Sequence, residues 1–279
     1  MNRPNSLRPL KSSALLSAAG LALVATAAAA LPAAALAQGF AAYVSPPRVE
    51  VQIKPGEPLR QVIELQHVGN QPGQYRFYTN DWTLNPDNGV NFTNELAPDS
   101  CRPWVAIERR DLTLSAGARY RYRLEITPPA NTPPRECRFA LMIEGLDPAR
   151  VSGAVSFPVS GRIGVIVYAA IGGAKPALSL SGQQVVTVNG QPTAVLNVQN
   201  TGNATGRLEG FVNATDANGQ RVELSPVDMP VLPGTTRGIA LTPVFDPGQK
   251  PPVLAFPLQV SGSLEWADQR LPIDARFAP

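Results

Sequence analysis

The segment that decides the fold is residues 151–168, V-S-G-A-V-S-F-P-V-S-G-R-I-G-V-I-V-Y. In its first half, apolar residues alternate with small ones at a period of two, which is the period of a β-strand. Val155, Phe157 and Val159 would share one face of that strand. Pro158 donates no ladder hydrogen bond, and proline in sheets is confined to edges, first positions or bulges. The segment therefore predicts an edge strand with one apolar face, which needs either a cover or pairing with another chain.

The first 37 residues have the composition of a secretory signal peptide. Three basic residues, Arg3, Arg8 and Lys11, precede an alanine-rich apolar run, and Ala35-Leu36-Ala37 is a small-residue cleavage pattern. Cleavage before Gln38 would lower the basic count from 24 to 21, equal to the 21 acidic residues. A neutral exported chain does not indicate a nucleic-acid or anionic-lipid partner. No later segment approaches 18 uninterrupted apolar residues, so we expect no membrane insertion and a soluble exported protein.

Turn residues divide the remaining sequence into short apolar runs. The chain has 29 prolines and 23 glycines, and Asn189-Gly190 and Asn218-Gly219 each lie between two apolar runs, a strong hairpin signal. The composition shifts to small residues at 172–176. We therefore predict an all-β protein with two immunoglobulin-like β-sandwich domains, one over residues 38–172 and one over residues 173–279.

The alternation is clearest over residues 119–126, where three arginines alternate with apolar residues. This pattern predicts an aromatic face directed into the core and an arginine face directed into solvent, as in a strand of a half-exposed antiparallel sheet. We interpret these arginines as a solvated strand face and not as a binding site.

Cys101 and Cys137 are the only cysteines, and an exported protein meets an oxidising environment. We therefore predict a disulfide between them. The alternative is a metal site, but one histidine and two distant cysteines supply four ligands only with the help of carboxylates.

No constellation of catalytic residues is recognisable. His67 is the only histidine, and it lies in a predicted strand just before a turn, where a structural role is expected. Without a second candidate base, no nucleophile–histidine arrangement can be assembled. The sequence therefore predicts a non-enzymatic protein without catalytic residues, cofactor or metal.

Several landmarks occur in an order that resembles the periplasmic chaperones of chaperone-usher pili, the PapD-like family. They are Pro47-Arg48-Val49 followed by Pro55-Gly56, then residues 104–126, and finally residues 161–168. The resemblance covers residues 43–169 and only the architecture of the second domain. In that family, alternating residues of the last strand of domain one complete a pilus subunit that lacks its own final strand. The resemblance implies that Val155, Phe157 and Val159 are the donor residues, with Val151 or Gly153 as an earlier member of the series.

The family also anchors the terminal carboxylate of the subunit with two basic residues. Arg48 matches the first, and the second position falls on Gly164, so that Arg162, on the same strand face, is the candidate substitute. Two further departures are Pro158 in the donor segment and a disulfide in domain one.

The resemblance implies that pilus or surface-fibre subunits and an outer-membrane usher are the partners, and it leaves a self-capping dimer of free copies open. The competing hypothesis is a two-domain fibre subunit or tip adhesin. A subunit should lack a strand of its own and carry an alternating amino-terminal extension, and residues 38–43 are too short for one. A β-sandwich enzyme is a third hypothesis, for which no constellation of residues provides support.

Overall fold

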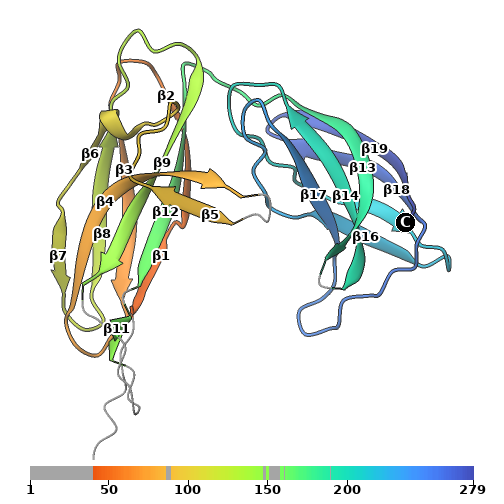
Figure 1. Cartoon of the computed structure of the whole chain (residues 1–279), viewed down its shortest axis with the longest axis horizontal. Helices are drawn as coiled ribbons and strands as arrows, with labels where there is room; N and C mark the ends of the chain where they lie inside the picture. Colours follow the sequence, from red (N-terminus) through yellow and green to blue (C-terminus); the bar gives the residue numbers. More distant parts are fainter. Residues whose placement is uncertain (1–39, 86–88, 147–148, 151–157, 160, 189) are drawn as a thin grey trace, which may run out of the picture.

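The fold is all-β, as predicted, with two β-sandwiches side by side (Figure 1). The structure is a computed structural model that describes residues 40–85, 89–146, 149–150, 158–159, 161–188 and 190–279. Within these ranges the regular elements are strands and one short 3-10 helix, η2 (Arg102–Trp104). None of the described helical segments has the length and apolar character needed to cross a bilayer. The predicted signal peptide, residues 1–37, lies outside the described residues.

The first sandwich consists of two sheets packed face to face. One sheet has the order β1-β3-β8-β6, and the other has the order β2-β12-β9-β4-β5, with β7 also paired to β4. A separate two-stranded ladder joins β10 and β11. The strands are β1 (Ala42–Ser45), β2 (Arg48–Ile53), β3 (Leu59–His67), β4 (Gly73–Leu84), β5 (Val90–Thr93), β6 (Val105–Ile107), β7 (Asp111–Leu114), β8 (Arg119–Ile126), β9 (Arg135–Gly145), β10 (Ala149–Arg150), β11 (Pro158–Val159) and β12 (Arg162–Ile171).

Strand β8 shows how the sequence pattern determines the packing. Tyr122, Leu124 and Ile126 are buried, whereas the arginines that alternate with them are exposed. Tyr122 stacks on Phe77 of the facing sheet with the ring centroids 3.9 Å apart and the planes 6° from parallel. The period-two alternation therefore directs one face of β8 into the core between the two sheets.

The chain changes sheets between β1 and β2. Pro46 and Pro47 separate the two strands and have no N–H to donate to a ladder, so neither can continue the pairing of β1 with β3. After them, β2 pairs in parallel with β12, in the register Arg48 to Ile166 through Ile53 to Ile171. Strand β2 thus forms the edge of the second sheet beside one half of β12.

The second sandwich is a seven-stranded sheet with the order β13-β14-β17-β16-β15-β18-β19. It curls so that its two edge strands approach, and Gln183 Nε2 in β13 donates a hydrogen bond to Arg276 O in β19 (3.3 Å). The strands are β13 (Leu178–Val188), β14 (Gln191–Asn200), β15 (Val212–Thr215), β16 (Arg221–Pro226), β17 (Thr236–Pro243), β18 (Leu258–Trp266) and β19 (Gln269–Phe277).

Each sandwich encloses its own hydrophobic core. The first core runs from Val49 to Ile171, and the second from Leu178 to Phe277. Gly172 and Gly173 lie between them with φ angles of 63° and 80°, a left-handed conformation that glycine adopts without a steric penalty. The domain boundary after residue 172 stays a prediction, but the change of core and this turn both occur there.

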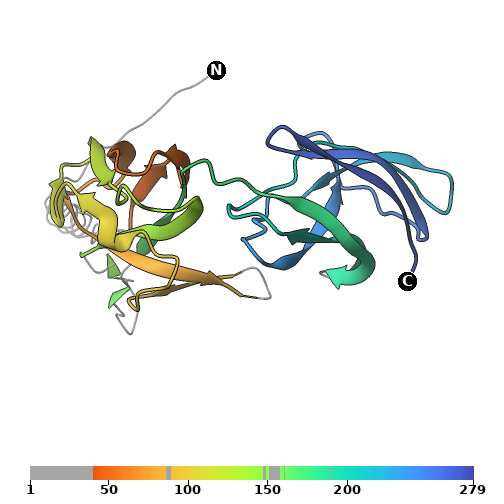
Figure 2. The same ribbon diagram turned by 90° about the horizontal axis from the view of Figure 1, so that it is seen from above.

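The β4–β5 hairpin extends from the first sandwich toward the second (Figure 2). The side chain of Leu232, from the second sandwich, packs against the cluster that includes Trp82 and Phe92 of this hairpin. Arg237 Nη2 also donates a hydrogen bond to Asn85 O (3.4 Å). The two sandwiches are therefore in contact at the hairpin as well as through the covalent connection.

His67 has the structural position that its strand pattern predicts. It is 4% exposed, with Nδ1 at 2.5 Å from the Tyr75 hydroxyl and Nε2 at 2.6 Å from Gln71 O. Because a carbonyl oxygen only accepts, Nε2 donates to Gln71 O. The ring thereby fixes the turn between β3 and β4.

Candidate functional site

One stretch of β12 has an open edge. Strand β9 pairs with the whole of β12, from Arg162 opposite Glu144 to Ile171 opposite Arg135. On the other side, β2 joins only at Ile166. Among the described residues, positions 162–165 of β12 therefore have no ladder partner on the β2 side.

The backbone groups at this open edge can be assigned from the ladder. Gly145 N–H donates to Gly161 O (3.0 Å), and bonding in an antiparallel ladder alternates from residue to residue. The odd-numbered residues of β12 thus bond to β9, whereas Arg162 and Gly164 direct their N–H and C=O groups away from it. An extended chain beside residues 162–165 would meet these free groups.

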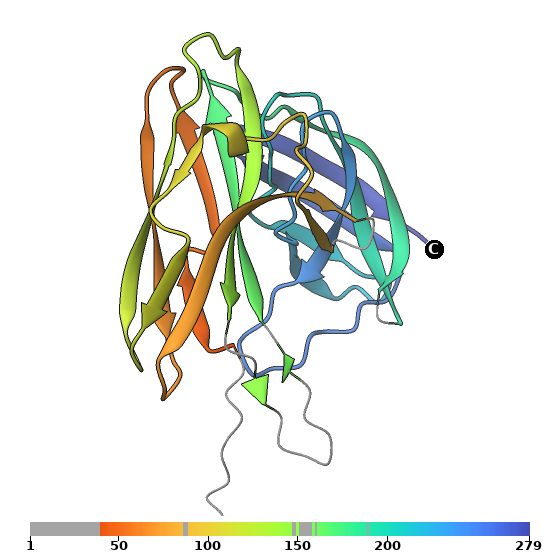
Figure 3. The same ribbon diagram turned by 60° about the vertical axis from the view of Figure 1, so that its left-hand side comes forward.

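The predicted donor residues precede this edge in the sequence. Val155 and Phe157 are outside the described residues. The backbone at Val159 belongs to β11 and pairs with Ala149 of β10. Figure 3 shows this short green pair at the end of the first sandwich opposite to its link with the second. The donor assignment is therefore still a prediction.

Arg48 lies at the opposite end of the open edge, beside the second domain. Its Nε is 2.8 Å from Glu50 Oε1, and its Nη1 donates to Asp228 Oδ2 at 2.8 Å. Arg207, from the second domain, contacts the same two carboxylates, with Nε at 2.9 Å from Glu50 Oε1 and Nη1 at 2.8 Å from Asp228 Oδ1. The four side chains form a closed ring of alternating charge that spans both domains.

Two pKa values in this ring are shifted in the directions that ion pairing favours. Desolvation alone would raise the pKa of Asp228, but the hydrogen bond from Arg48 and the charges of Arg207 and Arg48 lower it below its usual value. Desolvation alone would lower the pKa of Arg48, but the hydrogen bond to Asp228 and the charge of Glu50 raise it. Both groups are therefore charged at neutral pH.

Arg162 does not lie beside Arg48. It is exposed at the first position of β12, opposite Glu144, whereas Arg48 is level with Ile166. Four residues of strand separate these positions by about 13 Å. The two arginines that were expected to share one anchor thus lie at opposite ends of the open edge.

Phe92 packs on Gly164, the position where the resemblance led us to expect a second basic residue. A Cβ atom at Gly164 would lie 2.5 Å from Phe92 Cζ and 3.2 Å from Met142 Sδ. Glycine at this position therefore allows the β5 side chain to pack directly on the backbone of β12.

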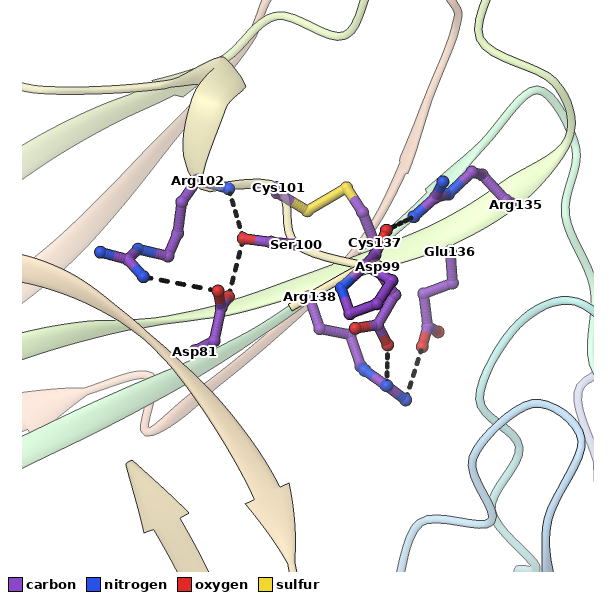
Figure 4. Close-up of a disulfide and its surroundings, with 10 residues drawn as sticks. Asp81, Asp99, Ser100, Cys101, Arg102, Arg135, Glu136, Cys137 and Arg138 are labelled. Carbon is purple, nitrogen blue, oxygen red and sulfur yellow. Dashed lines mark hydrogen bonds and ion pairs between the residues drawn. A yellow bond between two sulfur atoms is a disulfide. The ribbon is translucent and has the colours of Figure 1, made fainter. Parts of the chain in front are cut away.

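The predicted disulfide between Cys101 and Cys137 is present (Figure 4). It ties the segment before η2 to β9, and the side chains of Glu136 and Arg138 flank Cys137 in that strand. Glu136 accepts hydrogen bonds from Thr205 N (2.7 Å) and Thr205 Oγ1 (2.6 Å) in the second domain. Arg138 pairs with Asp99. The bridge therefore stabilises the strand from which one of the interdomain contacts is made.

A cleft of about 430 Å³ lies between the domains at this point. Its lining combines charged residues of the first domain with turn residues of the second: Asp99, Arg135, Glu136, Arg138, Gly202, Asn203, Pro233 and Gly234. Desolvation raises the pKa of Glu136, although hydrogen bonds from Thr205 and the charge of Arg138 oppose the shift. Within the described part of the chain, no three His, Cys, Asp or Glu side chains are arranged to hold a metal ion.

Sequence reasoning missed Arg207 and Asp228. Arg207 contacts Glu50, which is 157 positions away, and Asp228 contacts Arg48, which is 180 positions away. Neither residue lies in a motif or in an alternating run that would single it out. Only the placement of the two domains brings them together.

Comparison with known proteins identifies related folds. No protein-family model and no curated protein sequence matches the chain. Solved structures similar to it include the class 5 fimbriae chaperone CfaA, with 13% identity over 85% of this chain and 99% of that chain, at a TM-score of 0.45. The CupB2 chaperone of Pseudomonas aeruginosa has 12% identity over 85% of this chain and 100% of that chain, at a TM-score of 0.44. The E. coli chaperone DraB has 15% identity over 85% and 98%, also at 0.44.

Proposed function

We propose that the mature chain is a non-enzymatic periplasmic chaperone of pilus or surface-fibre subunits. It binds a subunit by donating a β-strand and delivers it to an outer-membrane usher. The observation that carries this proposal is the open edge of β12, where Arg162 and Gly164 direct backbone groups away from β9. An incomplete sandwich needs both ladder bonds and side chains from outside, and a donated strand supplies both.

The open edge determines the course of an added strand. Strand β2 is the neighbour of β12 in the sheet from Arg48 onward, and β1, which precedes β2 in the chain, belongs to the other sheet. A subunit strand beside residues 162–165 would thus be collinear with β2. If it runs parallel to β12, as β2 does, its carboxyl end arrives at Arg48. We therefore propose Arg48 as the anchor for the terminal carboxylate of the subunit, because a guanidinium matches a carboxylate in charge and geometry.

The sequence before β12 supplies apolar side chains with the required spacing. Val155, Phe157 and Val159 have odd numbers, like Val165 and Val167, whose side chains are fully buried in the first core. Residues two apart share a strand face, so a strand extended in the complex would present these three on the core side. Their burial in a subunit would contribute roughly 5–9 kcal/mol before the cost of ordering, at about 1.5–3 kcal/mol for each side chain.

Co-expression with candidate subunits in an exporting bacterium tests strand donation. Phe157→Asp should abolish recovery of the one-to-one complex, because it places a charge where the subunit core needs an apolar side chain. Ser156→Asp is the matched control, since it adds the same charge on the opposite strand face and should leave capture intact. The thermal unfolding midpoint of both variants should equal that of the parent. Equal capture by Phe157→Asp and the parent would remove the donor assignment.

A further inference from the structure

The ring of four charges between the domains consists of two arginines held by Glu50 and of one further carboxylate, that of Asp228. Glu50 Oε1 forms an ion pair with Arg48 Nε at 2.8 Å and accepts a hydrogen bond from Arg207 Nε at 2.9 Å. This shared contact holds both guanidinium groups in place from one side. Their Nη1 atoms bind the two oxygens of a single carboxylate, that of Asp228, at 2.8 Å each. We call Arg48, Glu50 and Arg207 the arginine cradle.

The cradle carries a net charge of +1, so it requires one further carboxylate for neutrality. Arg207 is firmly held, with 10% of its side chain exposed, Nη2 at 3.3 Å from the Tyr168 hydroxyl and its guanidinium carbon 5.5 Å from the centre of the Tyr168 ring. Asp228 is the opposite case, because 63% of its side chain is exposed and it lies on the loop between β16 and β17. Arg207 is thus the firmly held member of the cradle, whereas Arg48 and Glu50 have 39% and 49% of their side chains exposed, and the carboxylate comes from an exposed loop.

We propose that the arginine cradle is a carboxylate-binding site in which Asp228 occupies the place of a chain-terminal carboxylate of the bound subunit. This inference rests on the proposed function and adds two features to it. The second cation is Arg207 from the second domain, in place of a residue on β12. The site is also occupied by an internal competitor in the free chain, which a subunit must displace.

The competition has a measurable size. When a site is free for only a fraction of the time, its apparent dissociation constant rises in inverse proportion to that fraction. For a competitor that fills the site about nine-tenths of the time, removal of its charge tightens carboxylate binding about tenfold. Asp228→Asn removes the charge with little change in shape, and Asp228→Ala also removes the amide that could still hydrogen-bond to the arginines.

The test uses the full mature chain and three probes: the peptide acetyl-Thr-Val-Thr-Val-Tyr with a free carboxylate, the same peptide as its amide, and sodium acetate. Binding is followed by NMR through the Nε–Hε resonances of the arginines. For the free-acid peptide, we expect Asp228→Asn and Asp228→Ala to lower the dissociation constant about tenfold relative to the parent, with no change for the amide. Asp246→Asn is the matched control, since it removes the same charge from an exposed loop where Asp246 contacts Gln249, and it should behave as the parent.

Equal affinity of the parent and both Asp228 variants for the free-acid peptide would overturn the proposal. Acetate binding as tight as that of the peptide would overturn the assignment to a chain terminus, because the site would then bind any small carboxylate. The proposed function is judged separately by subunit capture. If Phe157→Asp abolishes capture but the Asp228 variants bind the free-acid peptide no more tightly than the parent, strand donation is supported and carboxylate binding by the cradle is refuted. If Phe157→Asp still captures the subunit but the Asp228 variants bind the free-acid peptide more tightly, strand donation is refuted and carboxylate binding by the cradle is supported.

Discussion

The contact between Phe92 and Gly164 leads to a prediction about Gly164→Ala. Its effect on the free energy of unfolding should depend on whether Phe92 is present. Gly164→Ala would place a Cβ atom 2.5 Å from Phe92 Cζ and 2.7 Å from Phe92 Cε1. Non-bonded carbon atoms normally lie about 3.5–4.0 Å apart, so the ring must retreat by about 1 Å. Overpacking of this kind costs about 1–3 kcal/mol. Replacing a strand glycine by alanine also returns about 0.5–1 kcal/mol, because the unfolded chain loses conformational freedom.

The two contributions separate in a double-mutant cycle. In the parent, the free-energy cost of overpacking opposes the gain from the lower entropy of the unfolded chain, so Gly164→Ala should be neutral to destabilising by up to about 2.5 kcal/mol. With Phe92→Ala present the ring is gone and only the flexible end of Met142, with Sδ at 3.2 Å, remains close, so the same substitution should be neutral or stabilise by up to about 1 kcal/mol. The coupling energy between the two sites is then the overpacking term, about 1–3 kcal/mol.

Urea unfolding of the four variants measures this coupling. The chain has three tryptophans, and a common Trp266→Phe background leaves Trp82 and Trp104, both in the first domain, as fluorescence reporters. With these two tryptophans, the fluorescence signal reports the unfolding of the first domain alone. A coupling energy under about 0.5 kcal/mol, the usual limit of additivity, would refute the idea that Phe92 requires glycine at position 164.

Three further results are expected. If the open edge donates backbone hydrogen bonds to a subunit, Arg162→Pro should weaken subunit capture, because proline removes the N–H group at this position. Arg162→Ala keeps the N–H group and should preserve capture. Equal capture by the two variants in co-expression would contradict this prediction. The folded-state pKa of Asp228 is depressed, so its stabilising contribution is present above the unfolded pKa and is lost as pH falls through the folded pKa. The difference in unfolding free energy between the parent and Asp228→Asn should therefore shrink on acidification from pH 7, and a difference independent of pH would exclude this linkage. Replacement of Cys101 and Cys137 by serine should lower the free energy of unfolding of the first domain by about 4 kcal/mol, as expected for a bridge that closes a loop of sequence separation 36. Dithiothreitol should cause a similar loss in the parent and none in the Ser variants, and equal unfolding free energies of the parent and the double variant would contradict this expectation.

The sequence was sufficient for those parts of the structure that depend on local pattern. Alternation over residues 119–126 predicts the buried and exposed faces of β8, because period two is a property of the strand itself. The hairpin between β13 and β14 follows from Asn189-Gly190 in the same way, and Gly190 has a φ of 77°. The disulfide was predictable for a different reason, since only one pairing of two cysteines exists.

The candidate site depends on distant pairs and was only partly predictable. Arg48 was singled out through the resemblance carried by Pro47-Arg48-Val49, but its partners Arg207 and Asp228 are defined by how the domains meet. The expectation for Arg162 rested on its sharing a strand face with Gly164, the position where the resemblance implies the second basic residue. Strand face says nothing about position along the ladder, and there Arg162 and Arg48 are four steps apart.

Arg48 and Arg162 lie at opposite ends of the open edge, so the direction of an added strand decides which arginine its carboxyl terminus approaches. Arg48 is level with Ile166, where the open edge ends, and Arg162 is at its beginning. A strand added beside residues 162–165 would bring its carboxyl terminus to Arg48 if it runs parallel to β12, and toward Arg162 if it runs antiparallel. The arginine cradle favours the parallel course, because at Arg48 a second cation, Arg207, contacts the same carboxylate. The arginine whose substitution weakens binding of a free-acid peptide but not of its amide thus reports the direction in which the partner strand lies.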